Sequence, residues 1–291
     1  MDEIISKAVT LIEALPYIQR FRSQVFVVKY GGSFMDSPDE EERHRVARDV
    51  VFLEAVGINP VVVHGGGKAI TRTLEEAGVK SEFVHGYRVT SEASAKIVDE
   101  VLSRKINPEI VKAIQDFGGK ARGVAGPDIF RCRKLQQKDE NGRDVDLGFV
   151  GEVIDVDVEP LRESIRRSVT PVISPTARGE DGKIYNCNAD IAAAKTAVAL
   201  KARRLVFMSD VPGLLREPKN DASLITHLRV NEVPQLQKSG VIGEGMIPKV
   251  NSATAAIESG VEKVQFVDGR IPHSVLLEIF TDAGVGTEVV L

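Results

Sequence analysis

Short apolar runs rich in β-branched residues alternate with longer helical patterns along this chain. The runs at 25–28, 61–63, 205–208 and 264–267 have the length and composition of buried strands. A strand followed by a helix, repeated several times, favours a mainly parallel sheet with helices on both faces. With 291 residues, 43% of them apolar, the chain is long enough for a large core or two lobes. The predicted fold class is therefore α/β.

Local signals mark where some of the helices begin and end. Ser37, Pro38 and Glu40 form the pattern of an N-cap serine, a proline at the first helical position and a glutamate at the third, so a helix is predicted to start there. A second helix is predicted from Gly67 to about Ala77. Each follows an apolar run and a glycine cluster, as expected for strand–helix units.

Two other stretches differ from this alternation. Residues 129–156, with Asn141-Gly142 near the middle, are typical of an antiparallel ribbon, and the Asp181-Gly182 turn precedes an alanine-rich helix at 189–201. Residues 1–20 carry a helical apolar face ahead of the first strand. That helix could cover the core of its own chain or serve as an interface arm, because an amphipathic helix needs an apolar partner.

Composition excludes several classes of protein. The net charge of −4 and the pI near 5.9 argue against a nucleic-acid-binding surface, which would be basic. Two cysteines, Cys132 and Cys187, indicate a reducing compartment more than a disulfide framework. No apolar run approaches the roughly 20 residues that span a bilayer, and Asp2 and Glu3 stand where a signal peptide would be basic. A cytoplasmic protein with neither a membrane nor a nucleic-acid partner is expected.

Glycine clusters end two of the predicted strands. "FVVKYGGS" places Gly31-Gly32 after the first run, and "VVVHGGGKAI" places Gly65-Gly66-Gly67 after the second. In α/β sheets ligands bind at the carboxyl ends of the strands, where glycine N–H groups and helix N-termini attract anions. The pattern is neither a P-loop, since Ala69 follows Lys68, nor a dinucleotide fingerprint, and His64 is expected to be structural. The two clusters predict an anion site.

Three further stretches complete an ordered set along the chain: "NCNAD" (186–190), "MSDVPG" (208–213) and "GEGMIPK" (243–249). Together with "KYGGS" and "HGGGK", they resemble the amino-acid kinase family over almost the whole chain. The segment "GYRVT" (86–90) is similar to that of the members that phosphorylate N-acetyl-L-glutamate, and differs from carbamate and uridylate kinases. The resemblance implies an open αβα sandwich with two lobes, an acceptor-binding and dimerisation lobe at 21–178 and a nucleotide-binding lobe at 179–291, after an interface helix at 1–20.

The resemblance also implies roles for particular residues. Lys29 and Lys249 would neutralise the negative charge on the phosphoryl group during its transfer, and Asp190 would hold both lysines in place. The acetylglutamate would be held by five residues, Gly66, Gly67, Arg88, Asn186 and Asn188. The nucleotide would lie against two glycines and two loops, namely Gly31, Gly32, Asp210, Val211, Pro212, Gly213, Leu214, Leu215, Ile242, Gly243 and Glu244. ATP is the implied co-substrate, with Mg²⁺ bridging its phosphates mostly through water and no dedicated protein metal site.

The first 20 residues gain a meaning from the same resemblance. Arginine-inhibited members carry such a helix, which joins homodimers into a homohexamer. The C-terminal "HSVLLEIFTDAGVGTEV" is similar to their L-arginine site, with candidates Tyr17, His273, Glu278, Gly284 and Gly286. A PII-type regulatory partner is left open. Two other functions stay open as well: another acylphosphate-forming kinase of this fold, or a non-catalytic arginine sensor.

Overall fold

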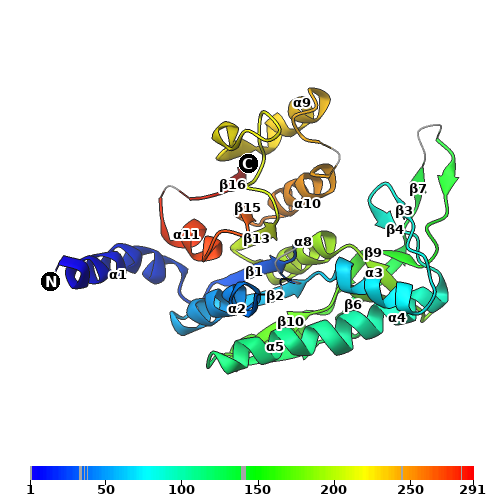
Figure 1. The fold of residues 1–291 in the computed structure, drawn as a ribbon, viewed down its shortest axis with the longest axis horizontal. Helices are drawn as coiled ribbons and strands as arrows, with labels where there is room; N and C mark the ends of the chain where they lie inside the picture. The colour runs from blue at the N-terminus through cyan, green and yellow to red at the C-terminus, as the bar shows by residue number, and fades with distance from the viewer. Residues whose placement is uncertain are drawn as a thin grey trace.

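The protein is built on one large sheet that is parallel almost throughout. The computed structural model describes residues 2–32, 35, 37, 39–138, 142–243, 245–282 and 284–291. Within these residues the chain forms an eight-stranded sheet in the order β14-β16-β15-β13-β1-β2-β10-β5 (Figure 1), in which β15 and β16 pair antiparallel and the other neighbours pair parallel. Its strands are β1 (Val25–Tyr30), β2 (Asn59–His64), β5 (Ala121–Val124), β10 (Thr170–Ile173), β13 (Arg204–Ser209), β14 (His227–Arg229), β15 (Lys263–Asp268) and β16 (Thr287–Val290). The predicted mainly parallel α/β class is confirmed.

Helices cover both faces of this sheet, as the strand residues show. Val27 packs in one apolar cluster with α8 and α10, whereas its neighbour Val28 packs in another with α2, α5 and α11. Successive side chains of a strand point to opposite faces, so the two clusters are the two halves of one sandwich. The helices and helical turns are α1 (Asp2–Phe21), α2 (Glu40–Ala55), α3 (Gly67–Glu76), α4 (Glu92–Val101), the π-helical turn η2 (Leu102–Ile106), α5 (Asn107–Asp116), α6 (Gly126–Ile129), α7 (Glu159–Arg166), α8 (Ala189–Leu200), η3 (Asp221–Ser223), η4 (Val230–Glu232), α9 (Val233–Lys238), α10 (Ile247–Glu258) and α11 (Ser274–Phe280).

A small barrel and two hairpins form separate sheets beside the large one. The barrel consists of β6, β9, β11 and β12, and the hairpins are β3–β4 and β7–β8. Their bounds are β3 (Phe83–Val84), β4 (Tyr87–Arg88), β6 (Phe130–Lys134), β7 (Gln137–Lys138), β8 (Asp144–Val145), β9 (Val150–Val156), β11 (Thr176–Gly179) and β12 (Ile184–Cys187). The predicted antiparallel ribbon is confirmed by the β6–β9 and β7–β8 pairs, although Asn141 lies outside the described residues. The boundary expected at 178/179 falls inside β11.

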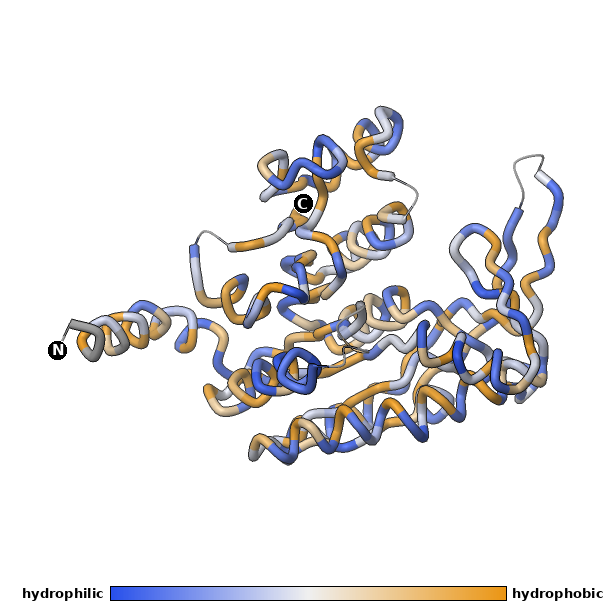
Figure 2. The backbone as a smooth tube through the Cα atoms, in the orientation of Figure 1, coloured by the Kyte–Doolittle hydropathy of each residue, from blue (hydrophilic) through white to orange (hydrophobic). Residues whose placement is uncertain are grey.

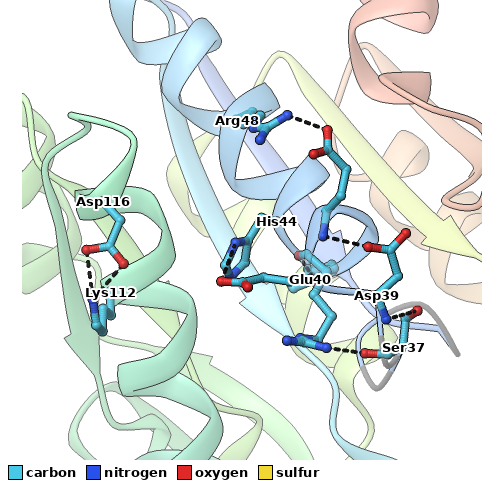
Figure 3. Close-up of polar contacts among 10 residues, drawn as sticks. Ser37, Asp39, Glu40, His44, Arg48, Lys112 and Asp116 are labelled. Carbon is cyan, nitrogen blue, oxygen red and sulfur yellow. Dashed lines mark hydrogen bonds and ion pairs between the residues drawn. The ribbon is translucent and has the colours of Figure 1, made fainter.

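Helix α2 starts later than the sequence indicates. Its N-cap is Asp39, whose side chain accepts a hydrogen bond from the N–H of Glu41 at 2.9 Å (Figure 3). Ser37 as the N-cap is therefore wrong; its Oγ instead accepts from the N–H of Asp39 at 3.2 Å, one turn before the helix. A carboxylate at this position caps as well as a hydroxyl does and also opposes the positive end of the helix dipole.

Helix α1 extends away from the rest of the molecule, with hydrophobic residues along it (Figures 1 and 2). Its contacts within the chain include α11. Five of its apolar side chains are exposed, the most open being Leu11 and Ile12 at 66% and 68%. No helix in the described ranges has both the length and the apolar content that crossing a membrane requires. Phe21 at the end of α1 is buried in the core, but these five exposed side chains are not covered by packing within this chain.

An ion pair joins α2 to α11 and gives the fold a pH dependence that can be measured. His273 Nδ1 lies 2.6 Å from Asp49 Oδ1, and Asp49 is only 2% exposed. Burial raises the pKa of Asp49 to about 6, and the histidine only partly offsets this. Because the pKa is higher in the folded than in the unfolded chain, the folded state binds the extra proton between about pH 4 and 6, and stability falls as the pH rises through that window.

We expect the Asp49→Asn variant to lose this part of the pH dependence. Between pH 4 and pH 7 the unfolding free energy of the unmodified chain should decline relative to the variant by up to about 3 kcal/mol. Urea unfolding of both proteins at several pH values measures the difference, and any pH-independent loss of the His273 contact cancels. Parallel stability curves for the two proteins would contradict the raised pKa of Asp49.

Candidate active site

Three charged side chains from distant parts of the chain meet at the carboxyl end of β1. Lys29 is the next-to-last residue of that strand, Asp190 lies in the first turn of α8, and Lys249 lies in the first turn of α10. The Lys29 Nζ is 3.0 Å from Asp190 Oδ1, and the Lys249 Nζ is 2.6 Å from Asp190 Oδ2. One carboxylate thus bridges two ammonium groups, one on each of its oxygens.

The electrostatics keep this carboxylate ionised. Burial by itself raises the pKa of Asp190. The charges and hydrogen bonds of Lys29 and Lys249 lower it by more than burial raises it, so that the resulting pKa is about 2. Burial also lowers the pKa of Lys29, while the attraction of Asp190 works against that shift. The cluster therefore carries excess positive charge, and its aspartate is unsuited to accepting a proton. It can attract and align anions.

The first glycine turn lets Lys29 fold over the backbone. A Cβ atom at Gly31 would lie 2.4 Å from the Lys29 Nζ and 2.9 Å from its Cε, so a larger residue would displace the ammonium group. Gly32 follows with φ of 140°, in the region that favours glycine. The two glycines place backbone N–H groups beside a buried cation.

The second glycine turn is tied to the first. The N–H of Gly65 donates to the carbonyl of Tyr30 at 2.7 Å, so that N–H is already used within the protein. Gly66 is the N-cap of α3 and Gly67 its first residue. The first N–H groups of a helix have no carbonyl one turn back, so those of this turn are suited to an anion.

Arg88 lies against this second turn and is held by several contacts. It donates to the Gly67 carbonyl at 3.1 Å, to the Thr71 Oγ1 at 2.8 Å and to the Ser81 hydroxyl, and it stacks 4.6 Å from the centre of the Phe83 ring. Burial lowers the pKa of Arg88, which is 7% exposed. A fixed, largely desolvated guanidinium beside helix N–H groups is suited to binding a carboxylate.

The two asparagines of "NCNAD" have different positions. The Asn186 amide donates to the Thr90 Oγ1 at 3.4 Å, next to the hairpin that carries Arg88. The Asn188 Oδ1 accepts from the N–H groups of Asp190 and Ile191, at 2.8 and 3.2 Å, and so caps α8. This cap orients the helix that presents Asp190, and an N-cap is the structural role that a polar stretch just before a helix favours.

A cavity of about 510 Å³ opens on the other side of Lys29 and Lys249. Five of the residues predicted for the nucleotide line it, namely Gly31, Gly32, Asp210, Val211 and Gly243. Ser209, Gly245 and Met246 also line it and were missed, although they adjoin the predicted loops. Such a space, lined by the first glycine turn, by Gly243 and Gly245 and by two lysines, suits a polyphosphate.

The other described residues that were predicted to bind the nucleotide do not line this cavity. Leu214 and Ile242 are 2% and 1% exposed and pack in the core. Gly213 has φ of 148° and lies under Thr287, whose Oγ1 accepts from the Leu214 N–H at 2.8 Å. Pro212 and Leu215 flank these two and are half-buried. Glu244 lies outside the described residues.

The donor atoms at this cavity fit a metal that arrives with the nucleotide. Among the residues that the structure describes, no group of three or more His, Cys, Asp or Glu side chains could hold a metal ion. Asp210 is an acidic side chain in the cavity lining, close enough to influence Lys29. One carboxylate suits a hydrated Mg²⁺ that is bound mainly by phosphate oxygens.

A second, smaller cavity of about 150 Å³ lies between α1, α11 and the edge strands. Tyr17, Glu278, Gly284 and Gly286 line it, and the Tyr17 hydroxyl donates to Asp282. Glu278 Oε2 accepts from the N–H of Gly286 at 3.1 Å, which fixes the carboxylate at the wall. The cavity thus brings together four of the five residues predicted for an effector.

His273, the fifth of these, is not among the residues that line this cavity. His273 is the N-cap residue of α11, and its side chain pairs with Asp49 of α2. The backbone of His273 has φ of 58°, a left-handed conformation immediately before α11. In this structure its ring links two helices across the sheet face.

Comparisons with known proteins agree with this geometry. The sequence model described as the amino acid kinase family matches residues 24–268. The acetylglutamate kinase of Akkermansia muciniphila is 45% identical over 292 residues, covering 100% of this chain and 97% of that protein, and the acetylglutamate kinase of Aquifex aeolicus is 48% identical over 302 residues, covering 100% of both.

Solved structures with lower sequence identity to this chain have a similar fold. The N-acetylglutamate synthase of Neisseria gonorrhoeae in complex with coenzyme A and N-acetyl-glutamate has a TM-score of 0.84 and 25% identity, over 98% of this chain and 63% of the synthase chain. Its complex with coenzyme A and L-arginine has a TM-score of 0.79 and 25% identity, over 97% of this chain and 65% of that chain. The chain thus spans less than two thirds of the synthase. With a family model matching most of its residues and relatives nearly half identical over its full length, this chain belongs to the amino acid kinase family, among the acetylglutamate kinases.

Proposed function

We propose that this protein transfers the γ-phosphoryl group of ATP to the γ-carboxylate of N-acetyl-L-glutamate, in the cytoplasm, as the second step of arginine biosynthesis. The observation that carries the proposal is the bridge of Asp190 between Lys29 and Lys249, two lysines that line the 510 Å³ cavity. The products are ADP and an acyl phosphate.

The chemistry requires alignment more than proton transfer. A γ-carboxylate with a pKa near 4.3 is ionised at neutral pH, so it can attack phosphorus without a general base. Both reactants are anions, and their approach needs cationic groups that are already in place. Lys29 and Lys249 supply these charges, and Mg²⁺ on the nucleotide adds further neutralisation of the phosphate oxygens. Asp190 holds the two ammonium groups in fixed positions, one on each of its carboxylate oxygens.

The substrate end of the site follows from the contacts around α3. Arg88 is placed to bind the α-carboxylate, with Asn186 and Asn188 on the acetamido side and the Gly66 and Gly67 N–H groups on carboxylate oxygens. The nucleotide would occupy the cavity at Asp210, Val211 and Gly243. The acceptor lobe is then 21–178 and the nucleotide lobe 179–291.

A comparison of acceptors tests the proposal. Purified protein with ATP-Mg should release ADP with N-acetylglutamate, and hydroxylamine should trap the acyl phosphate as a hydroxamate. Glutamate, aspartate and carbamate should give rates lower by at least about tenfold, because an unpaired Arg88 or asparagine costs more than 1 kcal/mol. Preference for one of those acceptors would assign another kinase, and no turnover with any of them would favour an arginine sensor.

The second cavity is the proposed site of L-arginine. The carboxylates of Glu278 and Asp282 are suited to a guanidinium, and the hydroxyl oxygen of Tyr17, whose hydrogen goes to Asp282, can accept a further hydrogen bond. The complex of the similar synthase with coenzyme A and L-arginine supports an effector role. Because α1 contributes Tyr17 to the cavity and presents exposed apolar side chains, we propose that α1 also joins homodimers into a homohexamer.

Deleting residues 1–20 should separate regulation from catalysis. We expect the truncated protein to keep its turnover without arginine within about twofold, since α1 extends away from the rest of the molecule (Figure 1) and contributes no residue to the nucleotide cavity, but to lose arginine inhibition. Its mass in solution should fall from hexamer to dimer. Light scattering and turnover at increasing arginine measure both. Tyr17→Phe keeps α1 but removes its hydroxyl from the cavity, so it should weaken arginine inhibition and leave the mass in solution unchanged. Undiminished inhibition after the deletion would show that α1 is not part of the effector site.

A further inference from the structure

His64 and Asn107 form a fully buried link between three elements beneath the α3 glycine turn. His64, at the end of β2, is 0% exposed and Asn107, at the start of α5, is 2% exposed. The His64 Nδ1 lies 2.8 Å from the carbonyl oxygen of Gly65, and its Nε2 lies 3.3 Å from the Asn107 Nδ2. The same Nδ2 donates to the carbonyl of Val172 in β10 at 2.8 Å.

These contacts assign the proton on the imidazole. A carbonyl oxygen can only accept, so the Nδ1 beside Gly65 must carry the hydrogen. The Asn107 group that faces Val172 must be the amide nitrogen for the same reason, and its second hydrogen then points to the His64 Nε2, which accepts. Burial lowers the pKa of His64 to about 4 although the Gly65 bond opposes this, so the ring is neutral at working pH. Both ring nitrogens are used, which excludes His64 as a base.

The carbonyl that His64 holds shares a peptide group with the N–H of Gly66. A trans peptide is planar, so its C=O and N–H point in opposite directions. Drawing the Gly65 oxygen inward toward His64 therefore turns the Gly66 N–H outward, away from the core. We propose that His64, held in its tautomer by Asn107, is a positioning residue that aims the Gly66 N–H at the carboxylate of the acceptor. This inference rests on the proposed function, because that function supplies the acceptor.

The π-helical turn η2 fixes the position of the same peptide. A Cβ at Gly66 would lie 2.4 Å from Ile106 Cδ1 and 2.7 Å from Leu102 Cδ2, so the glycine backbone is in close contact with η2. Asn107 follows η2 directly in the chain. A π-turn inserts an additional residue into a helix and is frequent at functional sites. Leu102 and Ile106 of η2 thus fix the position of the Gly65–Gly66 peptide. Asn107, which follows η2, fixes the orientation of the same peptide through His64.

Two near-isosteric substitutions separate positioning from packing. The amide nitrogen of an asparagine reaches the place of the histidine Nδ1, whereas that of a glutamine reaches the place of Nε2. We expect His64→Asn to keep kcat/KM for N-acetylglutamate within about threefold and His64→Gln to lower it by about tenfold or more, one hydrogen bond corresponding to roughly a factor of ten. The KM for ATP should change little in either variant. Equal losses in both variants, in step with their melting temperatures, would reduce His64 to a packing role.

A measurement on the unmodified chain is independent of how the variants fold. In a nitrogen-15 histidine spectrum, His64 should show a protonated Nδ1 and an unprotonated Nε2, unchanged between pH 5.5 and 8. A proton on Nε2 would overturn the proposal, since Nδ1 could then not donate to Gly65. This readout needs no turnover: a failed acceptor assay with the expected tautomer would reject the proposed function alone, and the wrong tautomer in an active enzyme would reject the positioning role alone.

Discussion

Replacing Lys249 with alanine is expected to lower kcat by roughly a thousandfold while raising the KM for ATP by less than about tenfold. The Lys249 ammonium lies 2.6 Å from Asp190 at the mouth of the nucleotide cavity, where charge spreads over the phosphoryl oxygens during transfer. A preorganised charge that acts mainly on the transition state affects turnover more than ground-state binding, and losses of 10² to 10³ are typical for one such group.

Initial rates at varied ATP and N-acetylglutamate measure this effect. Lys195→Ala is a matched control, because Lys195 is an exposed lysine on α8, the helix that carries Asp190. It should leave both constants unchanged. Turnover of Lys249→Ala close to that of the control would show that Lys249 has no part in phosphoryl transfer, whatever its distance from Asp190.

Much of the fold could be predicted because its strands are buried on both faces. Continuous β-branched runs such as those of β1 and β2 have few alternatives, and the glycines after β2 mark the point where α3 begins. The structure also brings Lys29, Asp190 and Lys249 together as the family resemblance implied, although 220 residues separate the first from the last. The carboxyl ends of parallel strands share one edge, so residues distant in sequence converge there.

The parts that could not be predicted depend on contacts between distant segments. The sequence leaves open whether Asn188 caps its helix or binds substrate, because capping depends on local backbone geometry, and in the structure its Oδ1 accepts from the N–H of Asp190. His273 precedes an amphipathic helix, and only the packing of α11 on α2 decides that its ring meets Asp49. The π-turn at Leu102–Ile106 has no sequence pattern of its own, so the role of Asn107 beneath the glycine turn becomes visible only in three dimensions.

The Asp190→Asn variant should lose turnover by about a hundredfold or more and also change its pH profile. The side chain keeps its shape, but Lys29 and Lys249 lose the anion that they share, and removing one partner of a buried ion pair costs about 3–5 kcal/mol. The pKa of Lys29 is already lowered by burial, and the attraction of Asp190 is what opposes that shift.

In the variant the pKa of Lys29 should therefore fall further, so that the ammonium group loses its proton at a lower pH. The reaction needs the charged form, hence the alkaline limb of the kcat profile should move to lower pH in Asp190→Asn than in the unmodified enzyme. Rates measured from pH 6 to 10 at saturating substrates show the position of this limb, and Asp181→Asn, which changes an exposed aspartate in a turn, serves as the control. A variant that is slow at every pH but keeps its limb in place would mean that Asp190 acts on Lys249 or on the helix alone, because Lys29 would then hold its proton without it.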